Sequence, residues 1–326
     1  MKAVVHHAYG SPDVLRFADV DTPSPGAGEV VVRTHAASVN ARDWHLLRGD
    51  PYLARLLAPE LGLRAPRQPI RGTDFAGTVE AVGSGVTRLR PGDEVFGESP
   101  GAFAEYVLAP ADVVDVKPAN LTFEQAAALP LAANTALMGL READAQPGQS
   151  VLINGASGGV GTFATQLAAE FGADVTGVCS PRNAELVRSL GAGRVVDYTR
   201  EDFTDQGRRY DVVFDLVGNR SLRALRRTLT PGGTLVLSGG GVSTGGSLVG
   251  PMALVIRGQA VARFVRQRIV VLTATPSHAN LAALRELAEA GKLTPVIDRT
   301  YPLSAAADAI RYLETDHARA KVVLTA

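Results

Sequence analysis

Short runs of alternating or wholly apolar residues recur through residues 1–122, for example at 29–34, 75–82 and 104–108. Clusters of glycine and proline, such as 23–26 and 90–93, separate these runs. Such runs, bounded by turn residues, are typical of β-strands, and their close spacing favours a compact barrel over a parallel sheet. The pattern therefore predicts an all-β first domain over 1–122.

The pattern changes near Thr122. Thr122-Phe-Glu-Gln125 resembles a capping box at the start of an alanine-rich helix. From there apolar runs alternate with amphipathic segments, which predicts a parallel sheet covered by helices on both faces, over residues 123–275. We expect strands at 151–155, 174–179, 194–197, 211–215, 233–238 and 268–272, and helices at 123–142, 159–171, 182–190 and 219–228.

The last segment of the chain does not extend this alternation. It predicts helices at about 280–290 and 304–314 and strands at 294–298 and 321–324. These strands have no place among the six of the parallel sheet, so we expect residues 276–326 to return to the first domain and complete it.

A glycine-rich loop gives the clearest chemical signal. A buried strand from Val151 leads into Gly155-Ala-Ser-Gly-Gly-Val-Gly161, and a helix follows. Glycines at such a turn let the backbone approach a pyrophosphate, and the helix N-terminus offers free N–H groups. Ala156 breaks the strict G-x-G-x-x-G pattern, so a turn with no ligand is the alternative. The flanking strand and helix favour a dinucleotide site.

The residues after the second strand of this domain indicate which dinucleotide binds. NAD-binding folds usually carry an Asp or Glu there for the ribose 2′-hydroxyl. This chain has Cys179-Ser-Pro-Arg-Asn183 instead. Ser180 and Arg182, with Tyr198 after the third strand, suit a 2′-phosphate, which favours NADPH over NADH. The alternative is that Arg182 is an ordinary solvated residue at the start of a helix.

Composition and charge exclude several classes of protein. Lys and Arg together number 33, as do Asp and Glu, so bulk charge points to neither nucleic acid nor a membrane surface. No apolar run reaches the roughly 18 residues of a membrane helix, and the first residues lack an apolar signal core, so we expect a cytoplasmic protein. The one cysteine, Cys179, ends an apolar strand and is expected to be a buried small residue rather than a nucleophile.

A set of motifs spread over nearly the whole chain carries a family resemblance. They are Tyr9–Leu15, Ala37–Asp43, Gly72–Val79, Val82–Val86, Pro91–Val95, Gly101–Val107, Ala126–Pro130, Asn134–Ala136, the glycine loop, Ser189–Ala192, Val196–Tyr198 and Ala318–Val322. With them the chain resembles the zinc-independent quinone oxidoreductase branch of the medium-chain dehydrogenase/reductase superfamily. The resemblance implies an α/β protein with a GroES-like β-barrel catalytic domain and a Rossmann doubly wound parallel sheet.

The resemblance also implies that no metal is bound. Zinc-dependent relatives place a Cys in the segment that matches Ala37–Asp43 and a His-Glu pair in the segment that matches Gly72–Phe75. Here Asn40 and Thr73-Asp74 stand at those positions, and no four-cysteine lobe is present. Because a catalytic zinc normally needs three good ligands, we expect no metal site.

Without a metal, hydrogen-bond donors must stabilise the negative charge that forms on a reduced oxygen. The resemblance places Asn40 by the nicotinamide, where its amide offers two donors. His45 matches a position where some quinone reductases carry a tyrosine, and it could donate a hydrogen bond or a proton near neutral pH. A surface histidine beside Trp44 is the alternative for His45.

The residues expected to bind the cofactor come from several strand ends and from the terminal basic segment. They are Asn40, Thr135, Ser157, Gly158, Gly159, Val160, Ser180, Arg182, Tyr198, Val217, Gly218, Ser238, Gly239, Gly240, Thr273, Arg319 and Lys321. For Thr135 the alternative is a helix-interior hydroxyl, and for Arg319 and Lys321 it is a solvated side chain.

These expectations converge on a zinc-free, NADPH-dependent reductase that acts on a small electrophile: a quinone, an enone or an aldehyde. An enoyl or 2-alkenal reductase that acts on a C=C bond is the alternative. A non-catalytic NADPH-binding structural or sensor protein is an alternative of another class. The family implies a homodimer, for which the strand near 233–238, taken as an edge, and the apolar segment 248–256 are candidate contacts. A substrate lid is the alternative for 248–256.

Overall fold

A computed structural model describes residues 1–57, 61–238, 250, 252–315 and 318–326. The chain divides into two compact units, which are described separately. Unit 1 consists of Met1–Asn134 and Thr275–Ala326, and unit 2 of Thr135–Ala274. The division falls inside a helix after Asn134, whereas the sequence pattern placed it at 122/123, where the composition changes.

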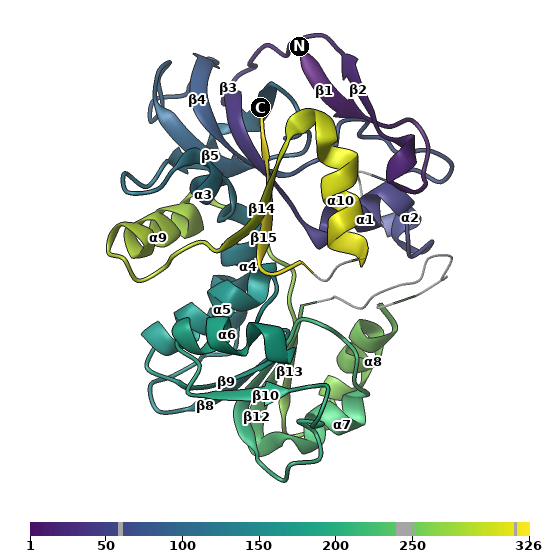
Figure 1. The fold of residues 1–326 in the computed structure, drawn as a ribbon, viewed down its shortest axis with the longest axis vertical. Helices are drawn as coiled ribbons and strands as arrows, with labels where there is room; N and C mark the ends of the chain where they lie inside the picture. Colours follow the sequence, from purple (N-terminus) through teal and green to yellow (C-terminus); the bar gives the residue numbers. More distant parts are fainter. Residues whose placement is uncertain (58–60, 239–249, 251, 316–317) are drawn as a thin grey trace. The chain divides into compact units, whose positions relative to one another are not determined.

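Unit 1 is built on a mostly antiparallel sheet (Figure 1). Its strands run in the order β14-β15-β3-β4-β5-β7, and β6 pairs with the other end of β3. A separate pair, β1 and β2, is antiparallel. The bounds are β1 Lys2–Val5, β2 Arg16–Asp19, β3 Glu29–Val39, β4 Asp74–Val82, β5 Glu94–Glu98, β6 Tyr106–Pro110, β7 Val114–Val116, β14 Ile297–Pro302 and β15 Lys321–Thr325.

The long strand β3 organises this sheet. It is antiparallel to β4, β6 and β15, so segments far apart in sequence meet on it. Val30 and Val32 of β3 pack with Phe75, Val79 and the other apolar residues of one buried cluster. The pairing of β15 with β3 confirms that the last strand of the chain returns to the first domain.

The helices of unit 1 are short, and three of them begin at the N-cap residues Asn40, Thr122 and Ser277. Their bounds are α1 Ala41–Arg48, α2 Ala54–Leu57, α3 Phe123–Ala127, α9 His278–Glu289 and α10 Ala306–Thr315, and α4 Pro130–Glu142 crosses into unit 2. The predicted helix over 123–142 is in fact two, because Pro130 has no N–H to continue α3 and instead starts α4. Thr122 caps α3 in the capping box expected from the sequence.

Unit 2 is an all-parallel sheet in the order β10-β9-β8-β11-β12-β13. The bounds are β8 Ser150–Asn154, β9 Asp174–Cys179, β10 Arg194–Asp197, β11 Tyr210–Asp215, β12 Leu229–Leu237 and β13 Arg268–Val271. All six predicted strands are therefore present. The order reverses direction at β8 and β11, which is where open parallel sheets bind ligands at the carboxyl ends of their strands.

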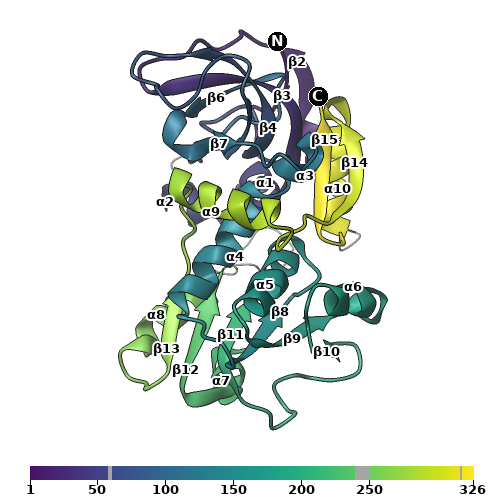
Figure 2. The same ribbon diagram turned by 90° about the vertical axis from the view of Figure 1, so that its left-hand side faces the viewer.

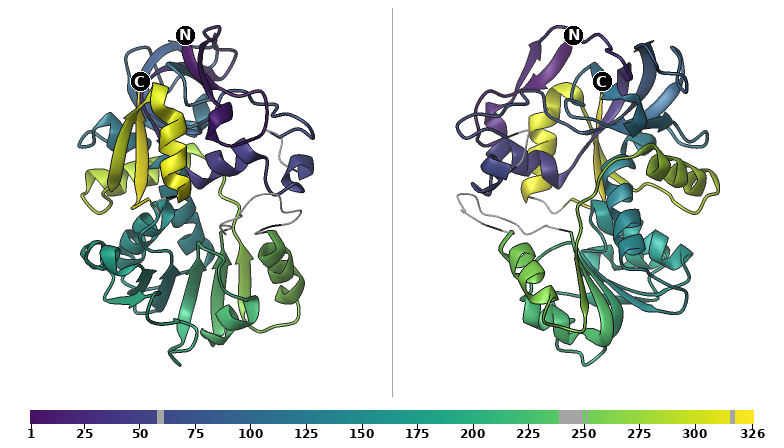
Figure 3. Two further views of the ribbon diagram at one scale, coloured as in Figure 1. Left: turned by 45° about the vertical axis from the view of Figure 1, so that its right-hand side comes forward. Right: turned by 180° about the vertical axis from the view of Figure 1, so that it is seen from behind.

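Helices cover both faces of the parallel sheet (Figures 2 and 3). They are α5 Gly159–Glu170, α6 Ala184–Ser189, α7 Leu222–Arg227 and α8 Met252–Ala262, and the part of α4 from Thr135 onward precedes β8. The sequence pattern did not predict α8. The expectation that the strand near 233–238 is an edge is wrong, because β12 lies between β11 and β13. Among the described residues no helix has the length and apolar character needed to cross a membrane.

Candidate cofactor and active site

The glycine loop of unit 2 is folded as a dinucleotide loop requires. Gly155 has φ +92°, a left-handed conformation that favours glycine. A Cβ on Gly161 would lie 2.0 Å from the carbonyl oxygen of Gly155, so only glycine allows α5 to pack this close to the loop. Gly158 caps α5 without a side chain. The backbone N–H groups of Gly159 and Val160 have no acceptor among the described residues, which leaves them for an anion.

A buried asparagine links the glycine loop to the end of β9. The Nδ2 of Asn183, a residue only 4% exposed, donates to Ser157 Oγ at 3.1 Å and lies 3.3 Å from Ser180 Oγ. The loop and the predicted 2′-phosphate position are thereby held together. Sequence analysis missed Asn183, although it directly follows the Ser-Pro-Arg segment to which we gave a cofactor role.

The predicted 2′-phosphate residues lie on the ends of neighbouring strands. Tyr198 N–H donates to Cys179 O at 3.3 Å, so Tyr198 and Ser180 follow adjacent ends of β10 and β9. The nearby carboxylate of Asp197 accepts hydrogen bonds from the N–H and hydroxyl of Thr199 within its own turn. Burial raises the pKa of the Cys179 thiol to about 11, which fits the expected buried residue and not a nucleophile.

A second pair of buried polar residues lies where β8 and β11 end. Asn154 Nδ2 donates to Asp215 Oδ1 at 2.8 Å, and the same oxygen accepts the N–H groups of Val217 and Gly218. The carboxylate therefore fixes the loop that carries two of the predicted cofactor residues. Asp215 Oδ2 is buried without a described partner. Sequence analysis missed Asn154 and Asp215, although each polar residue ends an apolar strand.

The remaining predicted cofactor residues of unit 2 stay predictions. Thr135 lies on α4 and is 6% exposed. Ser238 follows β12, and its N–H donates to Asp215 O. Thr273 is exposed after β13. Gly239 and Gly240 lie outside the described residues.

Unit 1 contains a buried polar network centred on Asp74, the first residue of β4. Asp74 Oδ2 accepts hydrogen bonds from Ser38 Oγ at 2.8 Å and Asn40 Nδ2 at 2.9 Å, and it lies 3.4 Å from Lys321 Nζ. Lys321 Nζ also donates to Asn40 Oδ1 at 2.6 Å. Because an ammonium only donates and a carboxylate only accepts, these partners fix the orientation of the Asn40 amide.

The side chains of Asn40 and Lys321 are both bonded within this network. The second acceptor near Asn40 Nδ2 is Ser38 O at 3.4 Å, so both amide hydrogens are directed into unit 1. In this conformation the Asn40 amide donates within unit 1, and its role as a donor to substrate stays a prediction. Lys321 was grouped with the cofactor-binding residues, but its side chain is 1% exposed and its ammonium is held by Asn40 and Asp74. Arg319 is exposed, and its role stays a prediction.

Two further carboxyl groups belong to the same buried region. Asp74 lies opposite Glu98 across β4 and β5. Burial, reinforced by repulsion from Asp74, raises the pKa of Glu98 to about 8, although Arg42 lies 3.8 Å away. Burial also raises the pKa of Asp43 to about 6, while its carboxylate accepts the Asn40 N–H at 2.8 Å in the capping box of α1. Sequence analysis gave Glu98 no role.

His45 lies on α1 against Trp44, with ring centroids 4.3 Å apart. Burial lowers the pKa of His45, which outweighs the opposing effect of Asp50, so the ring is neutral at neutral pH. A neutral imidazole can donate a hydrogen bond but is a poor source of a proton. The hydrogen-bonding role of His45 stays a prediction.

The positions that match the zinc ligands of relatives do not fit a zinc ion. They hold the Asn40 amide, the Thr73 hydroxyl and the Asp74 carboxylate, and the Lys321 ammonium is bonded to two of the three. A buried cation already satisfies Asp74, and an amide and a hydroxyl are poor zinc ligands. Within the described ranges no three His, Cys, Asp or Glu side chains are placed to hold a metal.

Comparison with known proteins agrees with both units. Residues 26–119 match the alcohol dehydrogenase GroES-like domain, and residues 190–324 match the family described as zinc-binding dehydrogenase. Over 99% of its length the chain is 36% identical to 2-methylene-furan-3-one reductase of Solanum lycopersicum and 35% identical to the chloroplastic NADPH-dependent alkenal/one oxidoreductase of Arabidopsis thaliana, covering 79% of each.

A solved structure, the quinone oxidoreductase of Coxiella burnetii, is 33% identical and superposes with a TM-score of 0.87, covering 100% of this chain and 99% of that one. The predicted combination of a GroES-like domain and a Rossmann sheet is confirmed, and the cofactor class is a nicotinamide dinucleotide. The chain therefore belongs to the quinone oxidoreductase branch of the medium-chain dehydrogenase/reductase superfamily.

Proposed function

We propose that this protein is an NADPH-dependent reductase of conjugated electrophiles, namely quinones or α,β-unsaturated carbonyl compounds. The observation that carries the proposal is a group of features at the carboxyl ends of the parallel strands, referred to below as the edge of unit 2. They are the free N–H groups of α5, the hydrogen bonds that link Ser157 and Ser180 through Asn183, and the loop held by Asp215. The relatedness to an NADPH-dependent alkenal/one oxidoreductase over 99% of the chain supports it.

Each part of this edge has a distinct task in holding NADPH. The N–H groups of Gly159 and Val160 are placed to bind the pyrophosphate. Ser180, Arg182 and Tyr198 supply the hydroxyl and guanidinium donors that suit a 2′-phosphate dianion. The carboxylate of Asp197, beside Tyr198, accepts hydrogen bonds from Thr199 and lies 3.6 Å from the Arg200 guanidinium, which offsets its charge. This donor set is the reason for choosing NADPH over NADH.

The bound cofactor supplies a hydride, and a proton from solvent or from the protein completes the two-electron reduction. Hydride addition to a quinone or an enone places negative charge on the carbonyl oxygen, which protein donors can stabilise. We assign His45 as the candidate donor, since Asn40 is engaged by Lys321 and Asp74. The buried network then serves to hold α1, whose first turn follows Asn40.

The central test is NADPH oxidation with a panel of quinones, 2-alkenals and enones, followed by absorbance. We expect oxidation with at least one class and a higher kcat/KM for NADPH than for NADH. Ser180→Ala with Arg182→Ala should lower that preference by at least about tenfold, because charge-assisted hydrogen bonds to the 2′-phosphate are lost. An unchanged preference would contradict the cofactor assignment.

A glycine variant tests the loop itself. A Cβ on Gly158 has no described neighbour nearer than Gly155 O at 3.4 Å, so Gly158→Ala should fold normally. It should nevertheless weaken NADPH binding at least about tenfold, because the Cβ enters the space where the pyrophosphate approaches the backbone. Gly232→Ala, where a Cβ meets nothing within 4 Å, is the matched control. Normal NADPH binding by Gly158→Ala would refute the site.

The substrate panel also separates the alternatives. Consumption of NADPH with alkenals but not quinones would identify a C=C reductase, the activity named for the Solanum lycopersicum and Arabidopsis thaliana relatives. Tight NADPH binding without oxidation by any electrophile would identify a non-catalytic NADPH-binding protein.

The cytoplasmic location and the homodimer stay predictions. The edge strand of the parallel sheet beside β12 is β13, so β13 replaces β12 as the proposed contact between subunits.

A further inference from the structure

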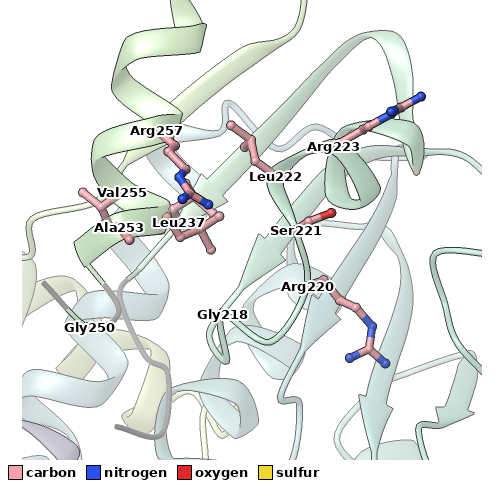
Figure 4. Close-up of a pocket in the computed structure, with 11 residues that line it drawn as sticks. Gly218, Arg220, Ser221, Leu222, Arg223, Leu237, Gly250, Ala253, Val255 and Arg257 are labelled. Carbon is pink, nitrogen blue, oxygen red and sulfur yellow. The ribbon is translucent and has the colours of Figure 1, made fainter. Parts of the chain in front are cut away.

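Unit 2 has a pocket of about 450 Å³ between α7 and α8 (Figure 4). Its volume lies within the range of small-molecule sites. Gly218, after β11, and Leu237, the last residue of β12, form part of its lining, so it opens at the carboxyl ends of the parallel strands. Of the described lining only Gly218 is also a proposed cofactor residue, so the proposed function gives the other lining residues no role.

The described lining combines apolar side chains with arginines. The apolar part comes from Leu222, Leu237, Ala253, Leu254 and Val255. Arg220, Arg223 and Arg257 are the charged residues, and no acidic residue is among the lining. Figure 4 shows the guanidinium of Arg257 beside Leu237, whereas Arg220 and Arg223 extend away from it. Arg257 shares α8 with three of the apolar lining residues, Ala253, Leu254 and Val255.

The segment of sequence that supplies the pocket's lining is unbalanced in charge. Between Asp215 and Glu286 the sequence contains no Asp or Glu. Within unit 2 that stretch carries eight arginines: Arg220, Arg223, Arg226, Arg227, Arg257, Arg263, Arg266 and Arg268.

Ion pairs from outside the stretch neutralise only some of these arginines. Arg220 pairs with Asp202 at 2.9 Å, Arg227 lies 3.8 Å from Asp205, and Arg268 lies 3.7 Å from Glu142. No carboxylate in the described part of the chain pairs with Arg257 or Arg223. A pocket with an excess of positive charge and an apolar wall attracts a negatively charged ligand that also has an apolar body.

We propose that this pocket binds an organic anion in which a carboxylate or phosphate head is joined to an apolar chain. The head lies against Arg257 and the chain against Leu237 and Leu254. Such a ligand is either a separate small molecule or the anionic tail of the substrate. The binding itself does not depend on the proposed reductase activity.

The test compares octanoate with octanamide, which has the same chain and no charge. Each is titrated by calorimetry into the protein with saturating NADPH, so that the cofactor's own site is filled. We expect octanoate to bind at least about tenfold more tightly than octanamide. Arg257→Met should make the two affinities similar. Arg208→Met, which removes an arginine paired with Asp174 at the amino end of β9, away from the carboxyl ends of the strands, should change neither.

A second variant tests the pocket and not only the charge. Ala253→Trp fills the space beside Leu254 and should abolish binding of both probes, while thermal unfolding confirms that the variant is folded. The proposal is overturned if the wild-type protein does not bind octanoate, if NADPH prevents the binding, or if Arg257→Met or Ala253→Trp binds octanoate as the wild type does.

The source of the anion is distinguished by turnover. An enone with a carboxylate tail is compared with its amide. If Arg257→Met raises KM for the carboxylate substrate alone, the pocket holds the substrate tail. If octanoate binds but KM is unaffected, the ligand is a separate molecule. Because binding is measured without turnover, an inactive protein that still binds octanoate would refute the reductase and retain the pocket.

Discussion

Removal of the Lys321 ammonium tests how the buried network of unit 1 is stabilised. Lys321→Met keeps a long side chain but leaves Asn40 Oδ1 without its donor and Asp74 without its cation. Lys321 and Asp74 are 1% and 0% exposed, so water cannot replace the lost partner. We expect a large loss of stability from this single change.

The distance sets the scale of that loss. Unit charges 3.4 Å apart attract by about 5 kcal/mol at an effective dielectric constant of about 20. Burial of two ions costs several kcal/mol each, which offsets most of this gain. Removing one partner leaves the other charge buried and uncompensated, a loss of about 3–5 kcal/mol. Lys321→Met with Asp74→Asn removes both charges, and we expect it to recover at least about 2 kcal/mol.

The single tryptophan makes the measurement specific. Trp44 lies on α1 of unit 1, so its fluorescence during urea unfolding follows this unit alone. A double-mutant cycle of the two single variants and the double variant gives the coupling energy. Lys2→Met, which removes a lysine paired with Asp19 on the surface, is the control and should have little effect. A double variant no more stable than Lys321→Met would refute the reasoning.

Three further predictions follow from buried groups. The pKa of Glu98 is raised from 4.5 to about 8, so between these pH values the folded state keeps a proton that the unfolded state releases. The free energy of unfolding should therefore fall as pH rises through this window, by up to about 1.4 kcal/mol per pH unit. Urea unfolding at a series of pH values should show a smaller dependence of this free energy on pH for Glu98→Gln, and an equal dependence would contradict the assignment. Cys179 should not react with a thiol-specific disulfide reagent at neutral pH until urea unfolds the protein, because its thiol is buried with a pKa of about 11; rapid reaction of the native protein would be evidence against this. Gly161→Ala should destabilise unit 2 by at least about 2 kcal/mol, since the new Cβ would lie 2.0 Å from Gly155 O, whereas Gly232→Ala should be neutral in the same thermal unfolding assay.

The sequence predicted those helices and strands for which the spacing of apolar residues and the residues at both ends indicate the same element. The six strands of unit 2 were found because their apolar runs are bounded by glycines and polar residues. The helix α8 was missed because Met252–Ala262 is apolar nearly all round and follows a glycine-rich segment, so no amphipathic period marks it. The break between α3 and α4 was missed because Pro130 was given less weight than the alanine-rich run around it.

The candidate site was predictable where its residues adjoin a motif. Ser157 and Ser180 were predicted as cofactor residues from the glycine loop and the end of the second strand, and Asn183 bridges them in the structure. The contacts of Lys321 and Glu98 with Asp74 were not predicted, because Asp74 is brought to them only by strand pairing between distant segments. Register of this kind depends on the whole sheet and leaves no local pattern in the sequence.

The pairing of β15 with β3 also bears on the order in which the chain can fold during synthesis. Unit 2 is an insertion in unit 1, since the strands of the unit 1 sheet are encoded partly before and partly after it. All of unit 2 emerges from the ribosome before β14 and β15, so it can complete its sheet while that of unit 1 still lacks two strands. Until Lys321 arrives, Asp74 has no ammonium partner, and the ion pair in unit 1 can form only after the last strand has been made.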